Sequence, residues 1–212
     1  MTLALENRVS IDLGICHHGP DCLDFAWQLH RQLSDGYTHR VSAMPMPDRF
    51  DLYLADHRTA RKRAARSERL GYRFEEIDRA EYADDVFAIN TSMPERQGRP
   101  MSGGYLERPR FSPNPMRCDR HHVYTYGVLT GDRLVAYLWL YRCGELAMVS
   151  SILGHADPLE GDVMYLLVTE TISAQTDLGG TLFYNLHSSG TDGLRYFKER
   201  LGLRPTEVAW LL

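Results

Sequence analysis

The chain has almost no lysine. Only Lys62 and Lys198 interrupt a set of basic residues that otherwise consists of 22 arginines. Arginine binds phosphate and carboxylate through a planar two-pronged fork, so this bias is typical of phosphate handling, although GC-rich coding produces it without any function. The 28 acidic residues outnumber the 24 basic ones and give a formal net charge of −4. This balance excludes a protein that binds nucleic acid through its overall charge.

Long apolar runs and cysteines are scarce as well. The longest apolar run, 134–141, is much shorter than the roughly 20 residues of a membrane-spanning helix. The first ten residues include Glu6 and no long apolar core, so we expect no signal peptide and a cytoplasmic protein. Four cysteines in 212 residues are too few for a disulfide scaffold, and a reducing compartment keeps them as thiols. The hydrophobic share of 43% excludes a disordered chain.

Positive charge is concentrated in one segment. Residues 57–73 hold seven basic residues and one acidic residue, which leaves the rest of the chain with a formal charge of −10. The pattern predicts a helix over 56–70 that ends at Gly71 and presents a basic face to a nucleic-acid backbone, because phosphate contacts need clustered cations. The alternative is a solvated helix balanced by an acidic run that follows it. The basic face would consist of Arg58, Arg61, Lys62, Arg66 and Arg69, and the acidic run of Glu75, Glu76 and Asp78.

Hydrophobic periodicity and turn residues predict a mixed α/β protein with a mostly antiparallel central sheet flanked by helices. We expect residues 1–55 to form an extension packed on a core of residues 56–212. The expected strands are 8–15, 40–46, 50–55, 72–77, 122–129, 134–142, 145–153, 181–187 and 206–212, and the expected helices are 22–35, 56–70, 80–91, 163–174 and 193–201.

This order of elements, with the closing segment LRYFKERLGLRP (194–205), resembles the GNAT acyltransferase superfamily over about residues 72–212. Acyl-CoA-dependent members of that superfamily carry a Q/R-x-x-G-x-G/A turn, whose backbone N–H groups hold a pyrophosphate at a helix N-terminus. The corresponding stretch here, LGHADPLEGDVMY (153–165), lacks that glycine spacing. The sequence therefore gives no positive sign of coenzyme A.

Several stretches resemble the branch of the fold that uses aminoacyl-tRNA, which comprises the FemABX peptidoglycan transferases and the arginyl-tRNA–protein transferases. HADP (155–158) is similar to the loop after the central strand of that branch, and GTDGLRYFKERLG (190–202) to its C-terminal "FK" helix. SDGYTHR (34–40) and HRTARKRAAR (57–66) resemble the Gly-aromatic-Arg turn and the basic stretch of the arginyl transferases. The N-terminal cysteine pairs of those transferases are not reproduced.

The resemblance implies an acyl- or aminoacyltransferase that uses aminoacyl-tRNA or acyl-CoA as donor and an amine or hydroxyl group as acceptor. Such an enzyme positions its nucleophile, takes its proton and stabilises the oxyanion with a backbone N–H, and it requires no cofactor. The expected partners are tRNA or another nucleic acid and a small-molecule, peptide or nucleobase acceptor, with no membrane. The alternative is a non-catalytic nucleic-acid-binding module that keeps the fold.

The proline- and glycine-rich stretch 89–105 is the first candidate site, because long ordered loops are often functional. Arg96 and Arg99 suit a carboxylate or phosphate, and Asn90 and Gln97 suit an amide or base edge. The alternative is an ordinary surface loop with exposed arginines.

The end of the strand at 181–187 is the second candidate, since the resemblance implies that this strand borders the point where donor and acceptor meet. His187 would take a proton from the acceptor, and Ser188 or Tyr105 would return one to the leaving group. His155 and Asp157 are open alternatives, and the remaining interpretation of His187 is a satisfied histidine at a strand end.

Cysteine and histidine gather in CHHGPDC (16–22) and CDRHH (118–122), and zinc accepts such ligands tetrahedrally. The C-x₅-C spacing is unusual for zinc and the two clusters lie a hundred residues apart. Buried cysteines with surface histidines are therefore the favoured interpretation, and no metal is expected. The residues concerned are Cys16, His17, His18, Cys22, Cys118, His121 and His122.

Overall fold

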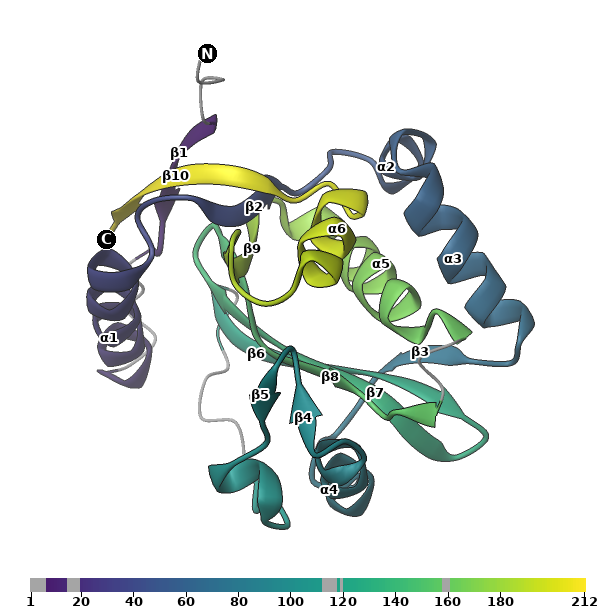
Figure 1. Cartoon of the computed structure of the whole chain (residues 1–212). Coiled ribbons are helices and arrows are strands. Elements are labelled where there is room, and N and C mark those ends of the chain that lie inside the picture. Colours follow the sequence, from purple (N-terminus) through teal and green to yellow (C-terminus); the bar gives the residue numbers. More distant parts are fainter. Residues whose placement is uncertain (1–6, 15–19, 112–117, 119, 158–160) are drawn as a thin grey trace.

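A large mixed sheet forms the centre of the protein, and helices cover it (Figure 1). The computed structural model describes residues 7–14, 20–111, 118, 120–157 and 161–212. The elements in chain order are β1 (Asn7–Asp12), α1 (Pro20–Gly36), β2 (Val41–Pro45), α2 (Phe50–Asp56), α3 (Arg58–Arg69), β3 (Arg73–Glu76), α4 (Ala83–Thr91), β4 (Glu95–Arg96), β5 (Arg99–Pro100), a 3₁₀ turn (Gly103–Leu106), β6 (His121–Thr130), β7 (Arg133–Cys143), β8 (Leu146–Gly154), α5 (Val163–Gln175), a second 3₁₀ turn (Thr176–Leu178), β9 (Thr181–Leu186), α6 (Asp192–Arg200) and β10 (Arg204–Leu211).

The predicted mixed, mostly antiparallel sheet is confirmed, and one predicted strand is wrong. Residues 50–55 form most of helix α2 (Phe50–Asp56) rather than a strand. The short sequence FDLYLA fits both periods, because Phe50, Tyr53 and Leu54 stand at helical spacing i, i+3, i+4 as well as near alternation. Tyr53 is buried, and Phe50 and Leu54 pack against the same core, so tertiary packing selects the helix.

The N-terminal part of the chain supplies strands to the sheet itself. The strand order is β1-β10-β2-β9-β8-β7-β6-β3, so β2 lies between β9 and β10. β1 runs parallel to β10 at the sheet edge, whereas β2 is antiparallel to both of its neighbours. Strand β2, which belongs to the segment 1–55 that we expected as an extension packed on the core, therefore lies within the sheet between two C-terminal strands.

Helix α5 lies between the sheet and helix α3, and it is apolar around its whole circumference for that reason. Leu166, Leu167 and Val168 are consecutive and at most 1% exposed. Ala60 and Ala64 of α3 belong to the same buried cluster, where small side chains let the two helices approach closely. Among the helices of the described residues, none combines the length and apolarity needed to cross a bilayer.

The sheet opens between β8 and β9. These two parallel strands pair only from Leu146↔Thr181 to Met148↔Phe183, although β8 continues to Gly154. On its other side β8 pairs with β7 along its length, but with a shift that leaves Ser150 as an extra residue in β8. A bulge of this kind increases local twist and is common beside active sites. The two strands therefore diverge and leave backbone without a neighbouring strand.

Two turn glycines offer a matched test of this packing. Gly131 and Gly144 have nearly the same positive φ, +57° and +56°. A Cβ on Gly131 would meet nothing within 4 Å, whereas one on Gly144 would collide with the backbone of Asp12 and Leu13 at the end of β1. We expect Gly131→Ala to cost about 1 kcal/mol of unfolding free energy for its left-handed backbone, and Gly144→Ala to cost about 1 to 3 kcal/mol more. Urea unfolding measures both, and equal losses would contradict the close approach of β1.

Candidate functional site

A cavity of about 220 Å³ lies where β8 and β9 diverge, and we call it the splay cavity. A second cavity of about 380 Å³, the α1 cavity, lies between helix α1 and strands β7, β8 and β9. The two cavities share Val149, Ser150 and Asn185, so they meet at the bulge of β8. The splay cavity is lined by Arg96, Gln97, Arg99, Val149, Ser150, Ser151, Ile152, Tyr184, Asn185, Ser189, Gly190 and Leu194.

The short hairpin β4–β5 brings arginine into the splay cavity. Gln97 and Gly98 form its two-residue turn, with φ of +53° and +74°, as the tight hairpin turns that suit strand twist require. A Cβ on Gly190 would lie 2.7 Å from Oε1 of Gln97, so the hairpin tip contacts the loop between β9 and α6. Three predicted substrate-binding residues, Arg96, Gln97 and Arg99, therefore lie together in the cavity wall.

Arg96 has a positive charge that no carboxylate neutralises within the described part of the chain. Its Nη2 donates to the carbonyl oxygen of Ile89 at 2.7 Å and to Oγ of Ser92 at 3.0 Å, which fixes the guanidinium in place. Its buried Nε has no hydrogen-bond partner among those residues. Burial lowers the pKa of Arg96 from its usual value. A fixed, partly desolvated guanidinium suits an anionic or carbonyl oxygen of a ligand.

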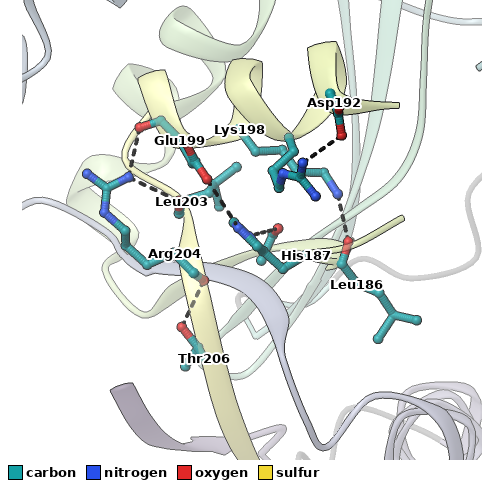
Figure 2. A network of polar contacts seen from close by, with 10 residues as sticks. Leu186, His187, Asp192, Lys198, Glu199, Leu203, Arg204 and Thr206 are labelled. Carbon is teal, nitrogen blue, oxygen red and sulfur yellow. Dashed lines mark hydrogen bonds and ion pairs between the residues drawn. The ribbon is translucent and has the colours of Figure 1, made fainter. Parts of the chain in front are cut away.

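Lys198 extends from helix α6 to the end of strand β9, as Figure 2 shows from close by. Its ammonium donates to the carbonyl oxygen of Leu186 at 2.7 Å and to Oγ of Ser189 at 3.1 Å, and it lies 5.1 Å from the ring centroid of Tyr184. The side chain is fully buried. Burial lowers the pKa of Lys198 to about 8. Because Tyr184 and Ser189 both line the splay cavity, Lys198 fixes two parts of its wall.

Lys198 was not among the site residues predicted from the sequence. Two signals pointed to it: it is one of only two lysines, and it belongs to the stretch that resembles an "FK" helix. The bulge at Ser150 had no local signal, because it depends on the pairing of β8 with β7.

His187, predicted as the proton acceptor, lies outside the lining of both cavities. Its Nδ1 is 3.0 Å from Oγ of Ser42 and its Nε2 is 3.5 Å from Oε1 of Glu199 (Figure 2). Burial lowers the pKa of His187, against the raising effect of Glu199. Ser188 is exposed, and Tyr105 lies exposed in the 3₁₀ turn Gly103–Leu106. The structure thus does not bring these three residues together at a cavity.

The other predicted substrate-binding residues also lie outside the cavity linings. Asn90 is buried in helix α4, where its Oδ1 accepts a hydrogen bond from the hydroxyl of Tyr137 at 2.8 Å. The backbone N–H of Asp157 donates to Nδ1 of His155 at 3.3 Å just after β8 ends. These contacts give Asn90 and His155 structural partners of their own.

The start of helix α5 carries a carboxylate. Asp162, its N-cap residue, has a φ of +62° and a side chain that is 11% exposed. Its carboxylate accepts hydrogen bonds from Arg63 at 2.8 Å and from Arg66 at 2.9 Å. This helix follows the central strand, at the position where the resemblance implies a pyrophosphate in acyl-CoA-dependent members. Because these two arginines outnumber the single carboxylate, the helix start has a formal charge of +1, and its charge does not exclude an anionic ligand.

The basic residues of α3 that do not bind Asp162 form an exposed face, as expected. Ala60, Ala64 and Ser67 are buried on the opposite side of the helix. The acidic run after the helix does not neutralise this face. In the described part of the chain, that run forms an ion pair with Arg73 instead, through Glu75 at 3.3 Å. The exposed basic face consists of Arg58, Arg61, Lys62 and Arg69.

The two cysteine and histidine clusters meet in space. Cys22, Cys118 and His121 are buried side by side, so the expectation of a surface histidine is wrong for His121, which is 0% exposed. The expectation of buried cysteines is confirmed for Cys22 and Cys118. Cys16, His17 and His18 lie outside the described residues.

Comparison with solved structures finds the same fold in two bacterial proteins. One is the C-terminal domain (DUF2156) of a protein named as a lysylphosphatidylglycerol synthetase from Agrobacterium fabrum, with a TM-score of 0.52 and 15% identity over 79% of this chain and 58% of that one. The other is L-PGS from Bacillus licheniformis, with a TM-score of 0.50 and 14% identity over 78% of this chain and 57% of that one. The mixed α/β sheet flanked by helices thus matches the fold of these GNAT-like domains.

The chain thus spans less than three fifths of the length of either solved protein. No protein-family profile matches the sequence, and no curated protein matches it.

The buried ammonium gives a pH-dependent stability that is specific to one lysine. Because the pKa of Lys198 falls from 10.5 to about 8 on folding, the unfolded chain holds a proton that the folded chain releases between these values. The unfolding free energy therefore rises with pH in this window. We expect the unfolding free energy of the wild type, relative to that of Lys198→Met, to rise by about 1 kcal/mol between pH 7 and pH 9. Urea unfolding at the two pH values measures it.

The exposed Lys62 provides the matched control. Lys62→Met removes the same side chain from the surface of α3 and should show the same pH dependence as the wild type. Parallel curves for the wild type and Lys198→Met would contradict the burial of a charged Lys198.

Proposed function

We propose that this protein is an aminoacyltransferase that moves an aminoacyl group from aminoacyl-tRNA to an amine or hydroxyl acceptor in the splay cavity. The observation that carries the proposal is that Arg96 and Arg99 line the same cavity as residues 149–152 of β8. This part of β8 contains the bulge and has no pairing with β9. The GNAT-like fold supports acyl transfer in general, and the name of one fold relative refers to a lysylated lipid.

The reaction needs little from the protein beyond placement and charge. The acceptor nitrogen or oxygen attacks the carbonyl carbon of the aminoacyl ester, the bond to the 3′-terminal ribose oxygen breaks, and the acceptor proton passes to that oxygen. Backbone N–H groups of β8 beyond Met148 and the guanidinium of Arg96 would stabilise the oxyanion. Arg99 would bind a terminal phosphate of the tRNA. Lys198 acts as a positioning residue, because it holds Ser189 and Tyr184.

Two features favour tRNA over coenzyme A as the source of the acyl group. The stretch 153–165 lacks the glycine spacing with which acyl-CoA-dependent members of the superfamily hold a pyrophosphate. The exposed basic face of α3, which includes Arg61 and Lys62, offers several phosphate contacts of the kind that a folded RNA provides. Acyl-CoA remains the competing donor in the experiments below.

The α1 cavity is the proposed place for the acceptor. It meets the splay cavity at Ser150 and Asn185. An acceptor in the α1 cavity would therefore reach the ester carbonyl of an aminoacyl group bound in the splay cavity. Its wall combines aromatic rings such as Phe25 and Tyr37 with the amides of Gln28 and Gln32, which suits an acceptor with both apolar and polar parts. Phosphatidylglycerol vesicles, peptides and nucleosides are therefore the acceptors to compare.

Transfer should depend on the two arginines of the hairpin. We expect Arg96→Ala and Arg99→Ala each to lower single-turnover transfer from aminoacyl-tRNA by about 10- to 100-fold, which corresponds to about 1.4 to 2.8 kcal/mol. Arg99→Lys should keep the charge but lose the fork geometry, and should fall between Arg99→Ala and the wild type. Release of labelled amino acid from tRNA into an acid-stable product measures the rate.

Arg133→Ala is the control for this series, because Arg133 is an exposed arginine at the start of β7 outside the cavity lining. It should transfer at the wild-type rate. Wild-type rates in both Arg96→Ala and Arg99→Ala, with the fold retained, would contradict the proposed site. Tight RNA binding without transfer from any donor would favour the non-catalytic module instead.

The basic face of α3 should set the salt dependence of tRNA binding. We expect the double variant Arg61→Ala/Lys62→Ala to weaken tRNA binding about fivefold or more and to lower the slope of log K against log salt by about 1.5 to 2. The double variant Arg31→Ala/Arg133→Ala removes the same charge from exposed sites elsewhere and should change affinity less than about twofold. Fluorescence anisotropy with labelled tRNA measures both, and equal effects would contradict a specific role of α3.

A further inference from the structure

Three metal-binding side chains from distant parts of the sequence converge in the interior. Cys22 lies on helix α1, Cys118 precedes strand β6, and His121 is the first residue of β6. The two sulfur atoms and a ring nitrogen all lie within 4.8 Å of one another. The three residues are 5%, 7% and 0% exposed. This cluster is separate from the lining of both cavities.

Two separations within the cluster are close to the edges of a zinc tetrahedron, and the third, between Cys22 and His121, is within 4.8 Å. Sγ of Cys22 is 3.6 Å from Sγ of Cys118, and Sγ of Cys118 is 3.3 Å from Nδ1 of His121. With Zn–S near 2.3 Å and Zn–N near 2.0 to 2.1 Å, a tetrahedral ion separates two sulfurs by about 3.8 Å and a sulfur from a nitrogen by about 3.6 Å. A disulfide bond, in contrast, would need the sulfurs about 2.0 Å apart.

The surroundings of His121 leave the correct nitrogen for a metal. Its Nε2 lies 3.2 Å from the carbonyl oxygen of Leu13 and 3.1 Å from that of Gly14. Since both of these atoms only accept hydrogen bonds, Nε2 carries the proton and Nδ1 presents its lone pair toward Cys118. A backbone carbonyl that holds the remote ring nitrogen in this way is the usual second contact of a metal-bound histidine.

The sulfur of Cys118 also contacts the backbone of His121. The backbone N–H of His121 donates to Sγ of Cys118 at 3.1 Å, and Sγ lies 3.7 Å from the carbonyl oxygen of His121. The two residues are spaced as C-x₂-H. Two thiolates and one neutral imidazole balance the double charge of Zn²⁺, so a buried complex carries no net charge.

We propose that Cys22, Cys118 and His121 bind a zinc ion, with a water molecule in the fourth tetrahedral position. Two sulfur ligands with one imidazole are the donor set that zinc prefers among the common divalent metals. Binding releases the two thiol protons to solvent. The ion would join α1 to the start of β6 and to the residues that follow β1, and α1 carries one wall of the α1 cavity through Phe25, Leu29 and Leu33.

The first experiment uses the full-length wild type. Protein purified without chelators should contain about one zinc per chain by plasma mass spectrometry. Reduced, metal-free protein titrated with Co²⁺ should develop the visible bands of a tetrahedral ion and a thiolate-to-cobalt charge-transfer band, and Zn²⁺ should remove both. Wild-type protein that holds no zinc and gives no cobalt spectrum would overturn the proposal, as would recovery of Cys22 and Cys118 joined in a disulfide.

Single variants then identify the ligands. Cys22→Ser, Cys118→Ser and His121→Ala should each lower zinc affinity at least tenfold in a competition titration with a chromophoric chelator. His187→Ala is the control for His121→Ala, because His187 is also buried and lies outside the cluster. Undiminished zinc binding in the three cluster variants would overturn the assignment. If a variant fails to fold, the cobalt spectrum of the wild type still tests whether thiolates bind a metal ion in the protein.

Discussion

The buried ammonium of Lys198 joins helix α6 to the end of strand β9. A desolvated charge costs several kcal/mol unless polar partners replace its water. Here the carbonyl oxygen of Leu186, the hydroxyl of Ser189 and the face of Tyr184 replace it. The turn after β9 must therefore keep its shape for the ammonium to remain satisfied, and that turn forms one wall of the splay cavity.

The opening between β8 and β9 lies beside this buried charge. The strands pair over three residues and then diverge, and the bulge at Ser150 increases the local twist of β8. The hairpin tip at Gln97 contacts Gly190 in the turn that Lys198 holds. A single buried charge thus links the strand that ends at the cavity, the loop beside it and the hairpin that supplies the arginines.

Local sequence patterns predicted most elements and their order, since the apolar run 134–141 and turn glycines such as Gly131 and Gly144 are strong local signals. They also singled out the arginine-rich stretch 89–105, which was expected to be a loop and which contains the hairpin β4–β5 in the cavity wall. They could not predict that β2 inserts between β9 and β10, because strand pairing over such separations depends on the whole sheet. For the same reason FDLYLA was misread as a strand, since its helical face is defined only by what Tyr53 packs against.

The site residues divide in the same way. Arg96, Gln97 and Arg99 lie within one hairpin, so their proximity was predictable from the sequence, whereas the splay that they face was not. His187 has the right residue type at a strand end, but Ser42 and Glu199, far away in the sequence, fix its ring outside the cavities. The meeting of Cys22 with Cys118 spans 96 positions and is likewise a product of the fold.

Hydrogen exchange with a bound donor mimic tests the central claim most directly. The probe is a short RNA with the 3′ end of tRNA, linked to its amino acid through a stable amide. We expect this probe to slow exchange at 95–100, 149–152 and 184–190, the three segments around the splay cavity, and coenzyme A to leave exchange there unchanged. Protection by coenzyme A at these segments, or RNA binding that leaves them unchanged, would contradict the central claim.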